Sequence, residues 1–195
     1  MQEPTERLRL FIAVRLPDEV KRRIEHAQRQ LRGAVGETAV RWTPPEQLHL
    51  TLRFMGNVDA AKLEDLQARL VQSCATTGPL RLQARGIGFF PVRGLPRVVW
   101  VGIEDPEGKL PVLVSALERS TAAFSSEPAG KKFTGHITLG RVRTIGQGQA
   151  RLLATEAATL GRGELGEWVA KEIDLMRSEL SSTGAQHTRV ATFPL

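Results

Sequence analysis

The chain contains one four-residue pattern twice. His49-Leu50-Thr51-Leu52 lies in the first third of the sequence, and His136-Ile137-Thr138-Leu139 lies in the second half. Polar and apolar residues alternate in both segments, as in a β-strand with one buried face. On such a strand the histidine shares a face with the threonine two positions later. If the two strands lie side by side, two imidazoles and two hydroxyls converge on one cleft.

Periodicity over the rest of the chain predicts further strands and helices. We expect strands, some of them short, over 7–15, 40–42, 48–54, 80–86, 97–103, 131–142, 168–180 (one strand or a pair) and 187–193. We expect helices from 18 to Gly33 or Gly36, from Asp59 to the residues before Gly78, from Asp105 onward, and over 147–160. Residues 55–57 are expected to form a turn.

This order of elements divides the chain into two halves of similar layout. Each half contains a His-x-Thr-Leu strand followed by a helix, which favours an internal duplication. We therefore expect an α+β fold of two duplicated α/β lobes, each an antiparallel sheet backed by helices, with the cleft between them. Because no low-complexity linker separates the halves, residues 1–195 are expected to form a single bilobal domain.

Charge and cysteine content limit the partners and the compartment. The chain has 27 Lys and Arg against 21 Asp and Glu, a net charge of +6. Such a surface attracts nucleic acid, although an arginine-rich solubilising surface explains the charge equally well. The single cysteine, Cys74, excludes an intramolecular disulfide and fits a reducing compartment. The apolar run 8–16 contains Arg9 and Arg15. It is too short and too charged for a signal peptide or a membrane span, so we expect a cytoplasmic monomer without membrane association.

A pair of histidines suits the cleavage of a phosphodiester. One neutral imidazole can take a proton from the nucleophile while a protonated one gives a proton to the leaving oxygen. A threonine hydroxyl on the same face can donate to a phosphate oxygen, and an arginine fork matches two such oxygens. Strand parity favours Arg53, which shares the face of Thr51. Arg141 reaches the cleft only if its strand is distorted near Gly140.

Other candidate residues leave alternatives open. Trp42, Phe89 and Phe90 could stack on a nucleobase or belong to the core. His187 could face the site or lie exposed on an edge strand. A metal site explains the histidines less well, because no carboxylate follows either of them at ligand spacing. No Gly-rich phosphate loop indicates a nucleoside triphosphate, so no metal and no cofactor are expected.

At its two motifs the chain resembles the two-histidine (2H) phosphoesterase superfamily. Within that superfamily it is most similar to the RNA 2′,3′-cyclic phosphodiesterase family, also called 2′-5′ RNA ligase. The likeness extends over nearly the whole chain, through residues 9–17, 41–42, 48–56, 136–141 and 175–180. It implies a metal-independent enzyme that opens 2′,3′-cyclic phosphates at RNA ends to 2′-phosphomonoesters. It also implies a reversible 2′-5′ ligation activity.

The same resemblance implies a role for each site residue. His49 would be the general acid that protonates the departing 3′ oxygen, and His136 would be the general base that activates water. Thr51 and Thr138 would hold the phosphate, and Arg141 would pair with it. The last assignment requires a distorted strand, which we expect at the glycine before this arginine.

Two departures from the family pattern concern substrate contacts. Thr134-Gly135 stands where the family often has Arg-Pro, and His187 stands where it often has a tyrosine; this chain has no tyrosine. His187 could replace that ring beside the nucleotide. Two other functions stay open: a non-catalytic RNA-end or nucleotide-binding protein, and a phosphodiesterase for small cyclic nucleotides or 2′-5′ oligonucleotides.

Overall fold

The computed structural model describes residues 6–127, 133–181 and 184–195. Its strands are β1 (Arg7–Arg15), β2 (Val40–Trp42), β3 (His49–Asp59), β4 (Leu80–Phe90), β5 (Val98–Glu104), β6 (His136–Val142), β7 (Glu164–Ala170), β8 (Glu172–Ser181) and β9 (Gly184–Pro194). Its α-helices are α1 (Asp18–Val35), α2 (Leu63–Cys74), α3 (Lys109–Thr121) and α4 (Gln147–Leu160). Short 3-10 turns cover Pro45–Gln47, Ala60–Lys62 and Ala122–Phe124.

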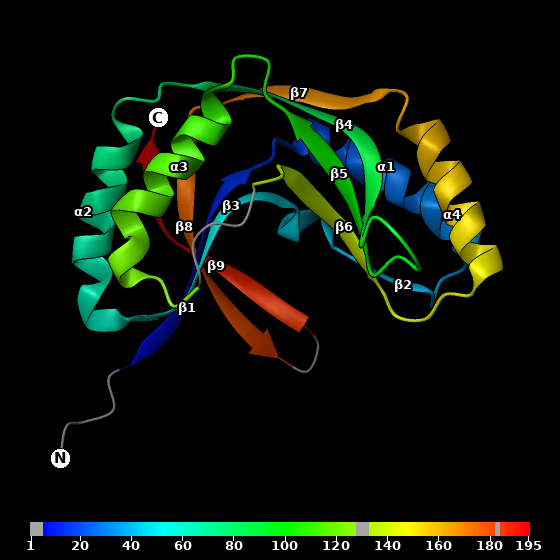
Figure 1. Cartoon of the computed structure of the whole chain (residues 1–195), viewed down its shortest axis with the longest axis horizontal. Helices are drawn as coiled ribbons and strands as arrows, with labels where there is room; N and C mark the ends of the chain where they lie inside the picture. Colours follow the sequence, from blue (N-terminus) through cyan, green and yellow to red (C-terminus); the bar gives the residue numbers. More distant parts are fainter. Residues whose placement is uncertain (1–5, 128–132, 182–183) are drawn as a thin grey trace.

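The strands form one curled antiparallel sheet. Its order is β7-β4-β5-β6-β3-β1-β8-β9, with β2 paired to β6. Helices α1 and α4 pack on the half that contains β4 and β7, and α2 and α3 pack on the half that contains β3 and β9. Figure 1 shows the two helix pairs on opposite sides of the molecule, with the strands fanning out between them. The predicted mixed α/β fold of helix-backed antiparallel sheet is confirmed.

The two lobes are not the N- and C-terminal halves of the chain. β3, from the first half, belongs with β8 and β9, which are the last two strands. β6, from the second half, belongs with β4 and β5. The lobes interleave because β1 pairs with β3 on one side and with β8 on the other. This exchange places both histidine motifs on the innermost strands of their half-sheets.

Most element boundaries follow the sequence pattern, with a few differences. The turn predicted at 55–57 is wrong: β3 continues through it, because β1 is long enough to pair as far as Asp59. α1 passes Gly33 and ends before Gly36, whose φ of 87° and N–H bond to Arg32 close the helix. β6 begins at His136, and residues 131 and 132 of the predicted strand lie outside the described residues.

One cluster of buried apolar side chains extends through both lobes. It includes Leu50, Ile137, Leu66 and Leu153, which belong to β3, β6, α2 and α4. This shared core favours the single domain predicted over residues 1–195. Of the helices that the structure describes, none combines the length and the apolar composition required to cross a membrane.

Candidate active site

A cleft of about 1500 Å³ lies where the two half-sheets meet. His49 and Thr51 reach it from β3, and His136 and Thr138 reach it from β6. The residues between them, Leu50 and Ile137, are fully buried in the core. The alternation predicted from the sequence therefore separates a polar cleft face from an apolar core face.

The strand register arranges the four polar side chains. β3 and β6 pair antiparallel through Leu50 and Ile137. This pair places His49 across from Thr138 and Thr51 across from His136. The histidines therefore occupy one diagonal of the four-residue group, and the threonines occupy the other. Diagonal neighbours on a sheet lie roughly 7–8 Å apart, with their β-carbons somewhat closer, which leaves room for a phosphate between two imidazoles.

Both imidazoles are held in the same tautomer. His49 Nδ1 lies 2.7 Å from the carbonyl oxygen of Gln47, and His136 Nδ1 lies 2.7 Å from that of Thr134. A carbonyl oxygen can only accept, so each Nδ1 carries a hydrogen. Each Nε2 is thus a base when the ring is neutral and a donor when the ring is protonated. The motif contributes this geometry twice, through a carbonyl two residues before each histidine.

His49 has an aromatic and largely dry environment. The Phe11 ring is 4.9 Å from it and the His187 ring is 5.4 Å from it, edge-on. Burial lowers the pKa of His49 to about 4, although its bond to the Gln47 carbonyl acts in the opposite direction. The positive charges that His187 and His136 can carry lower the pKa further. At neutral pH His49 is therefore uncharged in the free protein.

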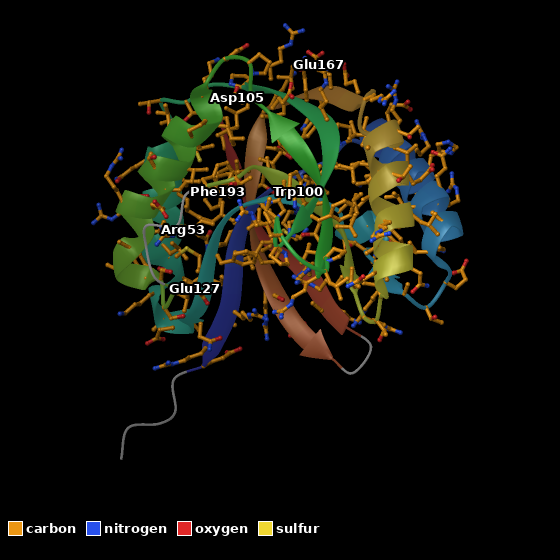
Figure 2. All side chains as sticks on the ribbon, turned by 45° about the vertical axis from the view of Figure 1, so that its right-hand side comes forward. Arg53, Trp100, Asp105, Glu127, Glu167 and Phe193 are labelled. Atoms are coloured by element: carbon orange, nitrogen blue, oxygen red, sulfur yellow. The ribbon has the colours of Figure 1, made fainter. Side chains whose placement is uncertain are left out.

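His136 lies among the rings of the other lobe. Its imidazole meets Phe90 edge-on at 5.1 Å and Trp100 at 6.2 Å. Trp100, labelled near the centre of Figure 2, lies over Gly88, where an added Cβ would come within 2.3 Å of the indole. Each catalytic candidate is thus supported by a pair of rings from its own lobe. Of the two neighbouring phenylalanines, Phe90 lines the cleft, whereas Phe89 packs against the core.

A bulge in β6 turns Arg141 into the cleft. Trp100 of β5 pairs with Thr138, whereas the next residue, Val99, pairs with Gly140. Leu139 is therefore the extra residue of a β-bulge, and the parity of the strand changes after it. Arg141 consequently shares the face of Thr138 and lines the cleft. The distortion that the family resemblance required is present, one residue before the predicted glycine.

A buried glutamine holds this bulge. The Gln28 side chain on α1 is 3% exposed, and its Nε2 donates to the carbonyl oxygens of Leu139 (2.8 Å) and Thr43 (2.9 Å). The Thr43 N–H also donates to the Leu139 carbonyl. These bonds satisfy the carbonyl of the bulged residue, which a regular strand would have paired. Gly140 is required beside it, because an added Cβ would lie 2.6 Å from Val40 Cγ1.

A matching bulge in β3 overturns the parity argument for Arg53. Ala13 pairs with Thr51 and Ile12 pairs with Arg53, so Leu52 is an extra residue. Arg53 consequently lies on the core face, where it is 7% exposed and its guanidinium is 3.8 Å from Glu118 of α3. Figure 2 shows it on the α3 side of the molecule. Part of its side chain still lines the cleft, and desolvation lowers its pKa.

The two remaining predicted site residues are Trp42 and His187. Trp42 lines the cleft but also packs against the core, on the face of Val40. His187 lines the cleft, with its ring 4.9 Å from Phe11. Burial and the charge of Arg9 lower the pKa of His187. Within the described part of the chain, His187 Nδ1 and Trp42 Nε1 are buried without a hydrogen-bond partner.

Sequence reasoning missed three residues of the site. Phe11 touches both His49 and His187, Gln28 holds the β6 bulge, and Arg41 pairs with Arg141 in the ladder and lines the cleft. The sequence carried a signal for Phe11, because it is an aromatic residue on the strand face that also carries Arg7, Arg9 and Arg15. Nothing in the sequence indicated that Gln28 belongs to the site, because a single polar residue on a helix is ordinarily exposed.

No group of three or more His, Cys, Asp or Glu side chains suited to a metal ion occurs in residues 6–127, 133–181 and 184–195. The polar side chains of the cleft are groups that donate and accept protons. Two tautomer-fixed imidazoles, two hydroxyls and a guanidinium on the inner strands of a curled sheet define a phosphoesterase of the acid–base type.

Comparisons with known proteins agree with this class. A profile of the family described as LigT like Phosphoesterase matches residues 14–100. The RNA 2′,3′-cyclic phosphodiesterase of Methanothermobacter thermautotrophicus is 31% identical over 189 residues, covering 97% of this chain and 100% of that protein. The protein of the same name from Thermus thermophilus is 34% identical over 194 residues, covering 96% and 90%.

Solved structures share the fold. TT0787 of Thermus thermophilus superposes with a TM-score of 0.78 at 31% identity, covering 96% of this chain and 98% of that chain. E. coli LigT complexed with 3′-AMP gives a TM-score of 0.74 at 24% identity, covering 97% and 99%. The chain belongs to the LigT-like, two-histidine phosphoesterase family, among the RNA 2′,3′-cyclic phosphodiesterases.

Proposed function

We propose that this protein hydrolyses 2′,3′-cyclic phosphate ends of RNA to 2′-phosphomonoesters, with His49 and His136 as the acid–base pair. The observation that carries the proposal is the shared geometry of the two histidines. Both have Nδ1 fixed by a backbone carbonyl, and both line one cleft. Each Nε2 is then available to a phosphate between them. The names of the relatives over nearly the full chain agree with this reaction.

Two proton transfers accomplish the reaction. His136 Nε2 takes a proton from water as the water oxygen forms a bond to phosphorus. The bond from phosphorus to the 3′ oxygen breaks, and His49 Nε2 gives its proton to that oxygen. The product is a 2′-phosphate and a 3′-hydroxyl, and the proton balance is restored by exchange with solvent. With an RNA 5′-hydroxyl in place of water, the same transfers form a 2′-5′ bond.

The low pKa of His49 bears on its role as the acid. In the free protein it is about 4, so His49 lacks the required proton at neutral pH. A bound phosphodiester carries a negative charge, and an adjacent anion raises the pKa of an imidazole. We therefore propose that His49 is protonated with the arrival of the substrate. Binding should then take up a proton at neutral pH.

The phosphate oxygens need donors in the transition state. Thr138 and Arg141 offer them from β6, and Thr51 offers one from β3. A hydroxyl and a guanidinium placed before the reaction begins stabilise charge without reorganisation. His187 and Trp42 line the same cleft and would contact the terminal nucleoside. Arg53 has no part in this assignment, because it lies on the core face.

The decisive assay uses an RNA oligomer that ends in a 2′,3′-cyclic phosphate, with a chelator present. We expect conversion to a 2′-phosphate, identified by end-group analysis. Persistence of the cyclic end, or a strict need for added metal, would contradict the proposal. A 3′-phosphate product would keep the hydrolysis but reverse the leaving group. Binding without any product would favour the non-catalytic alternative.

A further inference from the structure

The cleft continues beyond the histidine face of β3. Part of its lining comes from buried residues on the core side of β1, β3 and α3, together with two partly exposed neighbours. We call these residues the α3 branch: Leu10, Leu52, Arg53, Val114, Glu118 and Phe133. The whole cleft has a volume of about 1500 Å³, whereas a site for one small ligand usually takes ~300–1,000 Å³. It therefore has room for a second ligand beside the reacting nucleotide.

Arg53 lies in the α3 branch with its hydrogen-bond donors unsatisfied. Its side chain is 6% exposed, and its Nε is enclosed without a hydrogen-bond partner in the described part of the chain. The one described carboxylate within 4.0 Å is Glu118, whose Oε1 is 3.8 Å from Arg53 Nη1, too far for a hydrogen bond. A buried guanidinium is costly unless its N–H groups have acceptors. A ligand with acceptor atoms in the branch would supply them.

The charges around Arg53 disfavour an anion as this ligand. Glu118 is beside it, and Glu127 lines the cleft as well. Figure 2 shows Arg53 and Glu127 on the side of the molecule that carries α3. Two carboxylates would repel a phosphate or a carboxylate ligand, and repulsion is stronger where water is excluded. The ligand must therefore accept hydrogen bonds from Arg53, donate hydrogen bonds to Glu118, and carry no negative charge at that edge.

A guanine base has this pattern of acceptors and donors. Its O6 and N7 accept from the two arms of an arginine. Its N1–H and its N2 amino group donate to the two oxygens of a carboxylate. O6 and N1 belong to adjacent ring atoms, so the arginine and the carboxylate that hold them are close neighbours that need not bond to each other, as in Arg53 and Glu118. The branch also offers apolar contacts from Leu52 and Val114 and an aromatic ring, Phe133, of the kind that stacks on bases.

We propose that the α3 branch is a second ligand site, which binds the guanine base of a free guanine nucleoside while the histidine face remains available to the reacting RNA end. Arg53 binds O6 and N7, Glu118 binds N1 and N2, and Phe133 contacts the ring. The two sites lie on opposite faces of β3, since Arg53 pairs with the buried Ile12 and Thr51 faces the cleft. This inference goes beyond the proposed function and does not depend on it.

The test measures the binding of guanosine, inosine and adenosine by calorimetry. None of the three carries a phosphate, so the acid–base site contributes no phosphate contact to their affinity. Guanosine should bind most tightly. Inosine lacks the N2 amino group and should bind about ten-fold more weakly, because one donor to Glu118 is lost. Adenosine should bind more weakly still, since its 6-amino group presents a donor to Arg53 where guanine presents O6.

Two variants of the branch should change this order in different ways. Arg53→Met should weaken guanosine binding about ten-fold or more, because the bidentate contact to O6 and N7 is lost. Glu118→Gln should weaken it as well and should also abolish the preference for guanosine over inosine, because the amide cannot accept from both N1 and N2. A purely structural role of Glu118 would leave that preference intact.

A matched control makes the same substitutions in another arginine–glutamate pair. Arg81 of β4 and Glu167 of β7 form an ion pair, and neither lines the cleft. Arg81→Met and Glu167→Gln should each keep the wild-type affinity for guanosine and the preference over inosine. Circular dichroism should show that all four variants are folded. If Arg53→Met is poorly folded, Glu118→Gln still decides the question, because Glu118 is partly exposed.

Competition shows whether the second site is separate from the first. Guanosine affinity should be unchanged in His49→Gln, and unchanged when wild-type protein is saturated with an RNA oligomer that ends in uridine 2′-phosphate. Displacement of guanosine by this oligomer would overturn the inference. So would undetectable guanosine binding, equal affinity for guanosine and adenosine, or an equal loss in Arg53→Met and Arg81→Met.

The two proposals can fail independently. Turnover of a cyclic-phosphate oligomer is measured without any nucleoside present. If turnover is absent while guanosine binds and the branch variants lose it, the phosphodiesterase proposal fails and the second site stands. If turnover is present and guanosine does not bind, the reverse holds.

Discussion

Leu50 of β3 pairs with Ile137 of β6, and this backbone pair joins the two half-sheets at the centre of the molecule. Both side chains are fully buried, so the residues on either side of each must face the cleft. One apolar contact thereby fixes the relative positions of His49, Thr51 and their counterparts in β6.

Removing either imidazole should abolish most of the activity. His49→Gln and His136→Gln should each lower kcat on a cyclic-phosphate oligomer by about 10²–10⁴-fold, because a positioned acid or base is worth that much. Circular dichroism and thermal unfolding should show that the fold is retained. Near-wild-type turnover in either variant would contradict its assigned role.

The low pKa of His49 also predicts a dependence of stability on pH. Its pKa is about 4 in the folded protein and 6.5 in the unfolded chain. Between these values the unfolded chain binds more protons, so the free energy of unfolding rises with pH from about 4 to 6.5 and falls on acidification. His49→Gln should flatten this rise, measured as denaturant unfolding at several pH values. His187→Gln is a useful comparison, since burial lowers the pKa of His187 as well. An unchanged pH dependence in His49→Gln would contradict the assigned pKa.

Gln28 should act on the substrate through Arg141. Gln28→Leu removes two donors from the carbonyls of Leu139 and Thr43 and should cost about 1–3 kcal/mol of stability. It should also raise KM more than it lowers kcat, because the bulge that directs Arg141 is no longer held. A double-mutant cycle separates this from simple destabilisation: Arg141→Gln/Gln28→Leu should be no worse in KM than Arg141→Gln alone. Additive losses would mean that Gln28 is only structural.

Substitutions of the two arginines that follow the motifs should change KM by very different amounts. Arg141→Met should raise KM by about ten-fold or more, because a charge-assisted bond to phosphate is lost. Arg53→Met should leave KM within about two-fold, because Arg53 faces Glu118 on the core side of β3. Steady-state kinetics on the same oligomer compares them directly. A large rise in KM for Arg53→Met would restore the assignment made from strand parity.

Much of the site could be predicted from the sequence, because the patterns that indicate it involve only residues close together in the chain. A period of two and a repeated four-residue pattern indicated which face of each strand carries His49, His136 and their threonines, and all four reach the cleft. The ranges of β1, β2 and α4 also agree with the pattern. Expectations of a monomer and of a cytoplasmic location stay predictions.

Alternation along the strand predicted the wrong face for residues that follow a β-bulge. Nothing local to residues 49–54 indicates that Leu52 is an extra residue, since the bulge depends on how β1 pairs with β3. The same is true of Leu139, whose carbonyl is bonded by a glutamine from the first helix. Each bulge exchanges the faces of the residues that directly follow it, so Arg53 turns to the core face and Arg141 turns to the cleft.

The amino-acid order alone therefore determined which residue types alternate and which two segments carry the chemistry, because side-chain direction in a regular strand depends only on position. Tertiary structure decided the rest. It exchanged strands between the lobes, brought the motifs together at one apolar pair, and selected the phosphate-binding arginine through bulges. Those choices depend on contacts between residues far apart in the chain, which no local period records.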